Sequence, residues 1–317
     1  MCELLAMSSR LPTHVNLALR ELARHGGETG PHKDGWGIAY AMGRDFRIIK
    51  EPEAAAGSDC VRYIEAHRFT SRIVISHIRK ASLPKALSFE NTHPFDRELF
   101  GRRFVFAHNG HLPGIGALAA ELLGDVPARF LPLGETDSEA AFCLILNRLA
   151  AETAADPGAA GAGHGAEAYD PLRLWAILRD LSPHLLALGR ANFLLADGEW
   201  LFAHGDNSLH SLTRTCPVEA NTFQSETLRV RLEHATPQVA SLVATVPLTD
   251  NEAWQPFARG ELRVFHDGAQ VDAPPAKRST HRSAQAAARR TAKRPTAEAS
   301  GPPRGAPPRR RRQPAAR

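Results

Sequence analysis

The strongest constraint on how this chain can fold is a change of composition shortly after residue 270. The chain has almost no large apolar residue beyond Val271, and its last part is rich in Ala, Pro and Arg. Lys277–Arg317 holds 13 Lys and Arg side chains and one acid, Glu298, whereas the other 276 residues hold 26 basic and 33 acidic side chains. Such a segment buries too little apolar surface to offset its chain entropy. We therefore expect one folded domain at residues 2–272 and a disordered basic tail at residues 273–317.

The tail raises nucleic-acid binding as one function to weigh. Its run of arginines, Arg309–Arg312, suits contacts with phosphate groups. No aromatic residues are interleaved with these cations for base stacking, and the rest of the chain is acidic overall. These features favour a solvated tail over a nucleic-acid-binding segment.

Hydropathy and cysteine content exclude several other classes. No stretch approaches the roughly 18 apolar residues of a membrane-spanning helix, and the first ten residues lack the pattern of a secretory signal. The cysteines stand far apart and form no CxxC pair, which excludes a zinc ribbon or a dense disulfide framework. They are Cys2, Cys60, Cys143 and Cys216. We expect a cytoplasmic protein with reduced thiols and no membrane partner.

Apolar periodicity predicts many short strands and a few long helices, which indicates a layered α+β domain. Helices are expected at His14–His25, Asp137–Leu149 and Leu172–Leu188, the last kinked or split at Pro183. The Gly- and Ala-rich stretch Asp156–Ala168 predicts a flexible surface insertion. Strands are expected at Glu3–Met7, Gly37–Tyr40, Ile73–His77, Phe104–Ala107, Asn192–Ala196, Trp200–Ala203, Leu228–Arg231, Val239–Val246 and Leu262–His266.

The second residue is a candidate nucleophile. Removal of Met1, which the small side chain of Cys2 permits, would place a thiol and a free α-amine on one residue. Their reference pKa values, about 8.5 and about 7.7–8.0, are close enough for the amine to take the thiol proton, directly or through a water. This is the arrangement of an N-terminal nucleophile, which supplies its own base. By itself the pattern fits an incidental or buried cysteine better.

Two further segments combine glycine or a cation with a strand end. Asp34-Gly35-Trp36-Gly37 precedes a predicted strand, where the glycines permit close backbone approach or simply form a tight hairpin. Arg79 follows a strand that looks buried, and an arginine there can bind a carboxylate with two hydrogen bonds. The simpler interpretation of Arg79 is an exposed cation at the end of a strand.

Two polar segments complete the set. Asn109-Gly110 follows an apolar strand and offers a side-chain NH₂ and a main-chain N–H to an oxyanion, although Asn-Gly is also a common tight turn. Thr136-Asp137-Ser138-Glu139 opens a predicted helix with the spacing of a capping box. Asp137 could hold the ammonium group of a ligand, or these residues could simply cap the helix.

In this order, the segments resemble the class II glutamine amidotransferases of the N-terminal nucleophile hydrolase superfamily, and most closely their stand-alone bacterial branch. The resemblance covers most of the first 142 residues and continues more weakly to about residue 270. Each motif alone is weak, whereas six in the family's order are specific. They are MCELLAMSS at 1–9, GPHKDGWGIAY at 30–40, SHIRKAS at 76–82, ENTHPFDRELFGR at 90–102, FAHNG at 106–110 and GETDSEAAF at 134–142.

The resemblance implies a fold, a reaction and a role for each matching residue. The fold is a four-layer αββα sandwich, and the reaction is amide hydrolysis through a thioester, which needs no cofactor. Cys2 matches the nucleophile, and Asn109 and Gly110 match the oxyanion hole. Arg79 matches the group that binds the α-carboxylate of glutamine, and Asp137 matches the acceptor for its α-amine.

The substrate does not follow from the resemblance. Members of the sugar-phosphate and purine pathways continue after this arginine with Trp-Ala-Thr-His-Gly, whereas this chain has Lys80-Ala81-Ser82. We also find no long synthase domain, so a separate ammonia-accepting subunit is the partner expected for a glutamine amidotransferase. The alternative is a stand-alone hydrolase of γ-glutamyl thiol conjugates. Both accept glutamine or a γ-glutamyl amide and differ in the leaving group.

A metal-binding function is the alternative of a different class. His77, His93, His108 and His111 could be drawn together as ligands. Their spacing fits no zinc signature, and neutral, hydrogen-bonded histidines are commoner in proteins. We therefore expect no metal site.

Overall fold

The computed structural model describes residues 2–14, 22–67, 69–81, 87–156, 169–215, 221–224, 229–232 and 237–275. All of these residues belong to one compact unit, Met1–Ala276. The predicted tail beyond residue 275, most of the predicted insertion, residues 15–21 of the first predicted helix, and Cys216 lie outside the described residues. The domain boundary at residue 272 therefore stays a prediction.

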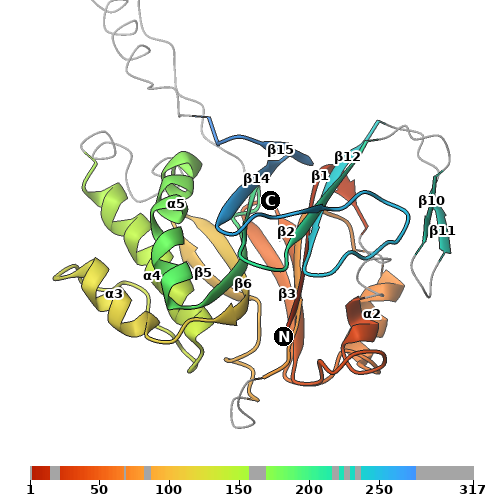
Figure 1. Ribbon diagram of the computed structural model, residues 1–317, viewed down its shortest axis with the longest axis horizontal. Helices are drawn as coiled ribbons and strands as arrows, with labels where there is room; N and C mark the ends of the chain where they lie inside the picture. Colours follow the sequence, from red (N-terminus) through yellow and green to blue (C-terminus); the bar gives the residue numbers. More distant parts are fainter. Residues whose placement is uncertain are drawn as a thin grey trace, which may run out of the picture. The chain divides into compact units, whose positions relative to one another are not determined.

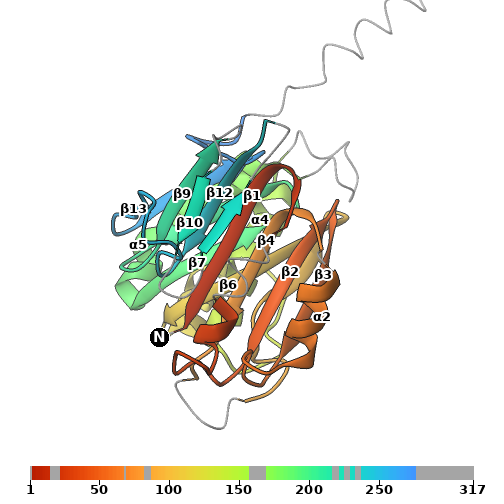
Figure 2. The ribbon, with the colours of Figure 1, turned by 90° about the vertical axis from the view of Figure 1, so that its right-hand side faces the viewer.

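Two antiparallel sheets form the centre of the unit. The first has seven strands and the second has six, and in Figure 2 strands β1, β4, β2 and β3 of the first lie side by side. The first sheet runs in the order β13 (Gln255–Pro256), β9 (His210–Thr215), β12 (Val239–Ala244), β1 (Glu3–Thr13), β4 (Ser71–Ile78), β2 (Trp36–Met42) and β3 (Asp45–Glu51). The second runs in the order β15 (Ala269–Val271), β14 (Glu261–His266), β8 (Trp200–Gly205), β7 (Arg190–Ala196), β6 (Arg102–His111) and β5 (Phe95–Leu99). A separate hairpin pairs β10 (Asn221–Gln224) with β11 (Arg229–Leu232).

Helices cover the outer faces of both sheets (Figure 1). On the six-stranded sheet lie α3 (Ile115–Leu123), α4 (Asp137–Ala154) and α5 (Pro171–Leu188), whereas α2 (Asp59–His67) covers the seven-stranded sheet. Three apolar clusters separate the layers, one between the sheets and one beneath each helical layer. The four-layer αββα sandwich that the resemblance implies is therefore confirmed.

The amino-terminal end of α4 follows the predicted capping pattern in part. The hydroxyl of Thr136 accepts the backbone N–H of Glu139 at 3.2 Å. The Glu139 carboxylate does not return to the cap, since it accepts the backbone N–H of Gly134 at 2.8 Å and the guanidinium of Arg97 at 2.6 Å. Thr136 therefore caps the helix, and the adjacent Asp137 is available for another role.

Most predicted elements are present, with extended ends, and several were missed. All nine predicted strands overlap an observed one within the described residues, and Asn109-Gly110 lie inside β6 rather than in a tight turn. The predicted split at Pro183 is wrong, because α5 runs through it as one helix, and a kink there stays a prediction. Helices α2 and α3 and strands β3, β5, β9, β10, β13 and β15 were not predicted.

Candidate active site

Four of the five predicted site residues come from the ends of β1, β4 and β6, at one end of the space between the two sheets, and the fifth, Asp137, begins α4. Strands β1 and β6 line this space with alternate side chains. Cys2 and Asn109 continue the two alternating rows beyond the apolar core. On β4, His77 continues the inward row of Ile73 and Ile75 and pairs in register with Leu4 of β1, so this strand end belongs to the same end of the sandwich.

Cys2 lies immediately before β1 and contacts the main chain that follows β4. The backbone N–H of Lys80 donates to Cys2 Sγ at 3.3 Å, and Sγ lies 3.5 Å from the carbonyl oxygen of Lys80. Burial raises the pKa of the Cys2 thiol, while the Lys80 N–H and the Arg79 guanidinium oppose that rise. The thiol is therefore mainly protonated at neutral pH and needs a base, which the α-amine of an N-terminal Cys2 could supply.

Arg79 is buried rather than exposed, since only 6% of it is accessible. A backbone pairing fixes it, in which Arg79 N–H donates to Gly35 O at 2.7 Å and Asp34 N–H donates to Arg79 O at 3.1 Å. The Asp34 carboxylate also accepts the backbone N–H of Ala81 at 2.8 Å. Asp34-Gly35 therefore clamps the segment that carries Arg79, and Gly35 has the positive φ (132°) that this close approach requires.

Asn109 and Gly110 lie near the end of β6, paired with β7. The side chain of Asn109 is buried, and its Nδ2 has no hydrogen-bond partner within the described part of the chain. The amide of Asn192 on β7 donates to Asn109 O at 3.2 Å and so fixes this stretch of main chain. A Cβ atom on Gly110 would lie 1.8 Å from the carbonyl oxygen of Arg190, so only glycine fits there. Asn109 therefore presents an unused donor, as an oxyanion hole requires.

Asp137 begins α4 and faces the end of β6. Its Oδ2 accepts the backbone N–H of Leu112 at 2.6 Å and Nδ1 of His111 at 2.9 Å. Its side chain is 23% exposed, whereas that of His111 is 63% exposed. Asp137 is therefore an accessible carboxylate tied to the same strand as Asn109.

The four histidines weighed as metal ligands do not form one cluster. His77 and His93 are buried with ring centroids 4.2 Å apart, but His108 bonds to Ser138 Oγ and Arg190 O, and His111 bonds to Asp137. Among the residues that the structure describes, no group of three or more His, Cys, Asp or Glu could hold a metal ion. Burial lowers the pKa values of His77 and His93 well below the usual range, so both rings are neutral.

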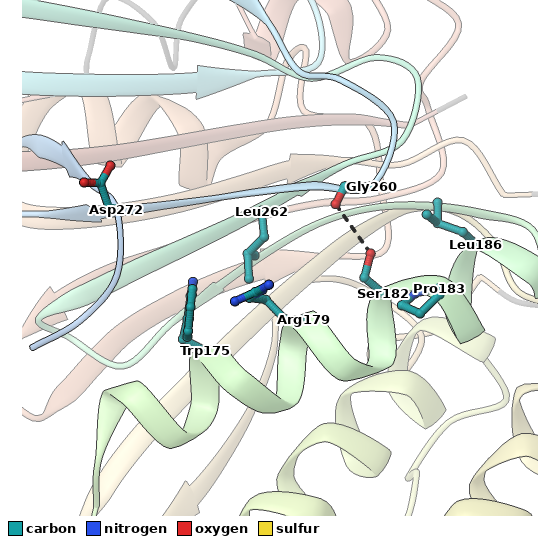
Figure 3. A pocket seen from close by; sticks show the side chains of 8 residues that line it. All are labelled: Trp175, Arg179, Ser182, Pro183, Leu186, Gly260, Leu262 and Asp272. Carbon is teal, nitrogen blue, oxygen red and sulfur yellow. Dashed lines mark hydrogen bonds between the residues drawn. The ribbon is translucent and has the colours of Figure 1, made fainter. Parts of the chain in front are cut away.

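A separate hollow of about 270 Å³ lies between α5 and β14 (Figure 3). It contains none of the predicted site residues and is lined by Trp175, Arg179, Ser182, Pro183, Leu186, Gly260, Leu262 and Asp272.

The hydroxyl of Ser182 donates to Nε2 of the buried His204 at 2.7 Å, because Nδ1 of that ring donates to Ala191 O at 2.6 Å. This pair satisfies the hydrogen-bonding groups of a buried imidazole.

Comparison with known proteins identifies the family. The model of the family "Glutamine amidotransferases class-II" matches residues 1–291, which is most of the chain. The chain belongs to the class II glutamine amidotransferases. It is 36% identical over 273 residues to the provisionally named glutamine amidotransferase YafJ of Escherichia coli (strain K12), which covers 86% of this chain and 100% of YafJ.

Solved structures agree with this family and with its fold. A predicted glutamine amidotransferase from Pseudomonas aeruginosa PA01 superposes with a TM-score of 0.61 at 35% identity, covering 85% of this chain and 99% of that one. Glutamine phosphoribosylpyrophosphate amidotransferase from Bacillus subtilis superposes with a TM-score of 0.54 at 14% identity, covering 85% of this chain and 48% of that one. The second likeness concerns the fold alone, which is that of the N-terminal nucleophile hydrolases. This chain is therefore an enzyme of the class II type.

Sequence reasoning missed three polar residues at this site of the amidotransferase. Asp34 was considered only as part of a glycine-rich turn, and His111 only as a metal ligand, whereas Asn192 gave no signal of its own. Each acts through a partner far away in the sequence, and no local pattern reports such contacts.

Among the described helices, none is long and apolar enough to cross a membrane.

Proposed function

We propose that this class II amidotransferase hydrolyses the side-chain amide of glutamine, or of a γ-glutamyl amide, through a thioester on Cys2. The observation that carries the proposal is the contact between Cys2 Sγ and the main chain of Lys80, the residue directly after the buried Arg79. This contact joins the Cys2 thiol to the segment that carries Arg79, whose guanidinium group can bind a substrate carboxylate. A substrate whose α-carboxylate is held by Arg79 would extend its γ-carbonyl toward the sulfur.

Removal of Met1 precedes catalysis and leaves a free α-amine on Cys2. That amine takes the thiol proton, and Sγ attacks the γ-carbonyl to form a tetrahedral oxyanion. Nδ2 of Asn109 and the backbone N–H of Gly110 donate to this oxyanion. The C–N bond then breaks as the ammonium form of the α-amine protonates the leaving nitrogen.

The product of this step is a γ-glutamyl thioester together with ammonia or an amine. Water then attacks the thioester carbonyl, again with the α-amine as base, and releases glutamate and the free thiol. Throughout, Arg79 holds the α-carboxylate and Asp137 accepts the α-ammonium group. These groups come from the chain itself, so the scheme uses no cofactor.

The fate of the nitrogen distinguishes two forms of this function. As a glutamine amidotransferase, the protein would pass ammonia to a separate synthase subunit. As a stand-alone hydrolase, it would release an amine that carries a thiol. Either form uses a reduced thiol, which agrees with the cytoplasmic location predicted from the sequence. Nucleic-acid binding rests on the tail, which lies outside the described residues.

The test is an assay of glutamate release with a matched pair of cysteine variants. Purified protein is incubated with glutamine, γ-glutamylcysteine and simple γ-glutamyl alkylamides, and intact mass spectrometry records whether Met1 is absent. We expect Cys2→Ser to abolish turnover and Cys60→Ser, at another free cysteine, to retain it. Activity in protein that keeps Met1, or in Cys2→Ser, would exclude this mechanism. Preference for the thiol conjugate over glutamine would favour the hydrolase.

A further inference from the structure

The two carboxylate oxygens of Asp137 differ in the hydrogen bonds that they accept. Oδ2 accepts two hydrogen bonds, from the backbone N–H of Leu112 and from Nδ1 of His111. Within the described part of the chain, the hydrogen bond given to Oδ1 comes from the hydroxyl of Ser138, at the long distance of 3.4 Å. The carboxylate is therefore held through one oxygen.

The hydroxyl of Ser138 is committed to another acceptor. Burial lowers the pKa of His108, so its ring is neutral and carries one N–H. Nε2 lies 3.0 Å from the carbonyl oxygen of Arg190, which can only accept, so the N–H is on Nε2. Nδ1 must then accept the Ser138 hydroxyl proton over 2.8 Å. Ser138 has no second proton for Asp137, and Oδ1 remains open to a ligand.

His111 stands at the open side of this carboxylate. It is the last residue of β6, two positions after Asn109, and its side chain is 63% exposed. Its Nδ1 donates to Oδ2 of Asp137 at 2.9 Å. An asparagine amide can replace this hydrogen bond, whereas a phenylalanine ring cannot.

We propose that His111 is a specificity-determining residue of this site. It acts through Asp137, because it holds Oδ2 so that Oδ1 faces the α-ammonium group of the substrate. The inference rests on the proposed function and names its substrate class, γ-glutamyl compounds with a free α-amino group.

The experiment measures binding separately from turnover. L-Glutamine is titrated calorimetrically at pH 8 into the full chain carrying Cys2→Ala, alone or with His111→Asn, which keeps a hydrogen-bond donor, or His111→Phe, which has none. His111→Phe should weaken binding by about fivefold to twentyfold, and His111→Asn by less than about twofold.

Two controls separate this effect from a general loss of binding. The analogue 4-carbamoylbutanoate lacks the α-amine, so its binding should not respond to the change at His111. His184→Phe alters another exposed histidine, on α5, and should leave the affinity for glutamine unchanged.

The outcomes distinguish this inference from the proposed function. Unchanged affinity for glutamine in His111→Phe, or an equal loss of affinity for 4-carbamoylbutanoate in that variant, would overturn the inference while leaving the thioester chemistry intact. The expected binding behaviour without turnover of any amide by the Cys2 protein would overturn the chemistry and support the role of His111. A protein that binds no glutamine at any pH would overturn both.

Discussion

The sulfur of Cys2 and the backbone of Lys80 contact each other twice, through the Lys80 N–H at 3.3 Å and the Lys80 carbonyl oxygen at 3.5 Å. Lys80 follows Arg79, whose backbone is paired with Asp34 and Gly35. The candidate nucleophile and the candidate carboxylate-binding group are thus held by one short stretch of main chain. The backbone therefore fixes the positions of Cys2 and Arg79 relative to each other more firmly than a contact between two flexible side chains would.

Replacing Arg79 should impair substrate binding first. Arg79→Ala removes a charge-assisted, two-pronged contact, and we expect KM for glutamine to rise by about tenfold to a hundredfold. A smaller loss of kcat through poor positioning would accompany it. Arg79→Lys should not restore KM, because an ammonium group cannot reproduce a planar fork. Steady-state kinetics on the active substrate would measure both effects.

The control for Arg79 comes from the strand that precedes it. Arg72 on β4 is exposed and pairs only at the surface with Asp267, so Arg72→Ala should leave KM unchanged. A lower melting temperature with wild-type KM in Arg79→Ala would show that Arg79 has a structural role only, and the assigned substrate pocket would be wrong.

Asn109 should act on the chemical step rather than on binding. Its Nδ2 is buried without a partner in the described residues, so Asn109→Ala removes a donor that is used only when the oxyanion forms. We expect kcat to fall by about 10²–10³ with a smaller change in KM. Single-turnover kinetics of thioester formation would test this expectation directly.

Asn192 provides a graded comparison with Asn109. It fixes the main chain of Asn109 through one hydrogen bond of 3.2 Å and also binds Asn207. Asn192→Ala should therefore lower kcat less than Asn109→Ala does. Equal kcat values in Asn109→Ala and the wild type would remove the oxyanion hole from the mechanism.

The features that depend on neighbouring residues could be predicted from the sequence. Alternating apolar residues located the long central strands, and Thr136 with Glu139 located the start of α4. Strands β3 and β5 escaped prediction because they lie at sheet edges or carry charged residues at alternate positions, as in DFRIIKE and FDREL. Helix α3 begins at a glycine with a left-handed backbone and has no side-chain cap, so the usual start signal is absent.

The candidate site was predictable as a set of motifs but not as a geometry. Six segments in order pointed to Cys2 and Arg79, whereas the contact of Asp34 with Ala81 spans 47 positions and that of His111 with Asp137 spans 26. Such contacts depend on sheet register and helix docking, which periodicity does not report. The burial of Arg79 also follows from the clamp by Asp34 and Gly35, and nothing in its neighbouring sequence indicates that clamp.

Gly110 should tolerate no side chain. A Cβ atom there would lie 1.8 Å from Arg190 O and 2.5 Å from Nε2 of His108, so the β6–β7 pairing must shift to admit it. Gly110→Ala should lower the melting temperature and abolish turnover. Gly116 on α3 is a matched control, since its added Cβ meets nothing within 4 Å. Gly116→Ala should leave activity intact and stabilise the fold by up to about 1 kcal/mol. Wild-type stability in Gly110→Ala would contradict the described register.

The buried histidines should make the fold sensitive to acid. Neither ring nitrogen of His77 or His93 has a hydrogen-bond partner among the described residues, and burial holds both pKa values well below the usual range. The unfolded chain takes up these protons below about pH 6.5, while the folded chain does not. The free energy of unfolding is therefore complete above about pH 6.5 and falls as the pH drops from there, by up to about 1.4 kcal/mol per pH unit for each histidine.

Phenylalanine at these two positions should remove that acid sensitivity. The His93 ring already packs against Phe95 at a centroid distance of 4.5 Å and against His77 at 4.2 Å, so His77→Phe and His93→Phe retain aromatic packing without a titrating group. Chemical denaturation at pH 7.5 and at intervals down to pH 5 would measure the free energy of unfolding at each pH. This free energy should fall less steeply with decreasing pH in each variant than in the wild type, and least steeply in the double variant. His184→Gln, which changes an exposed histidine on α5, should keep the wild-type slope. If the double variant loses stability in acid as steeply as the wild type, the two buried rings are not the source of the pH dependence.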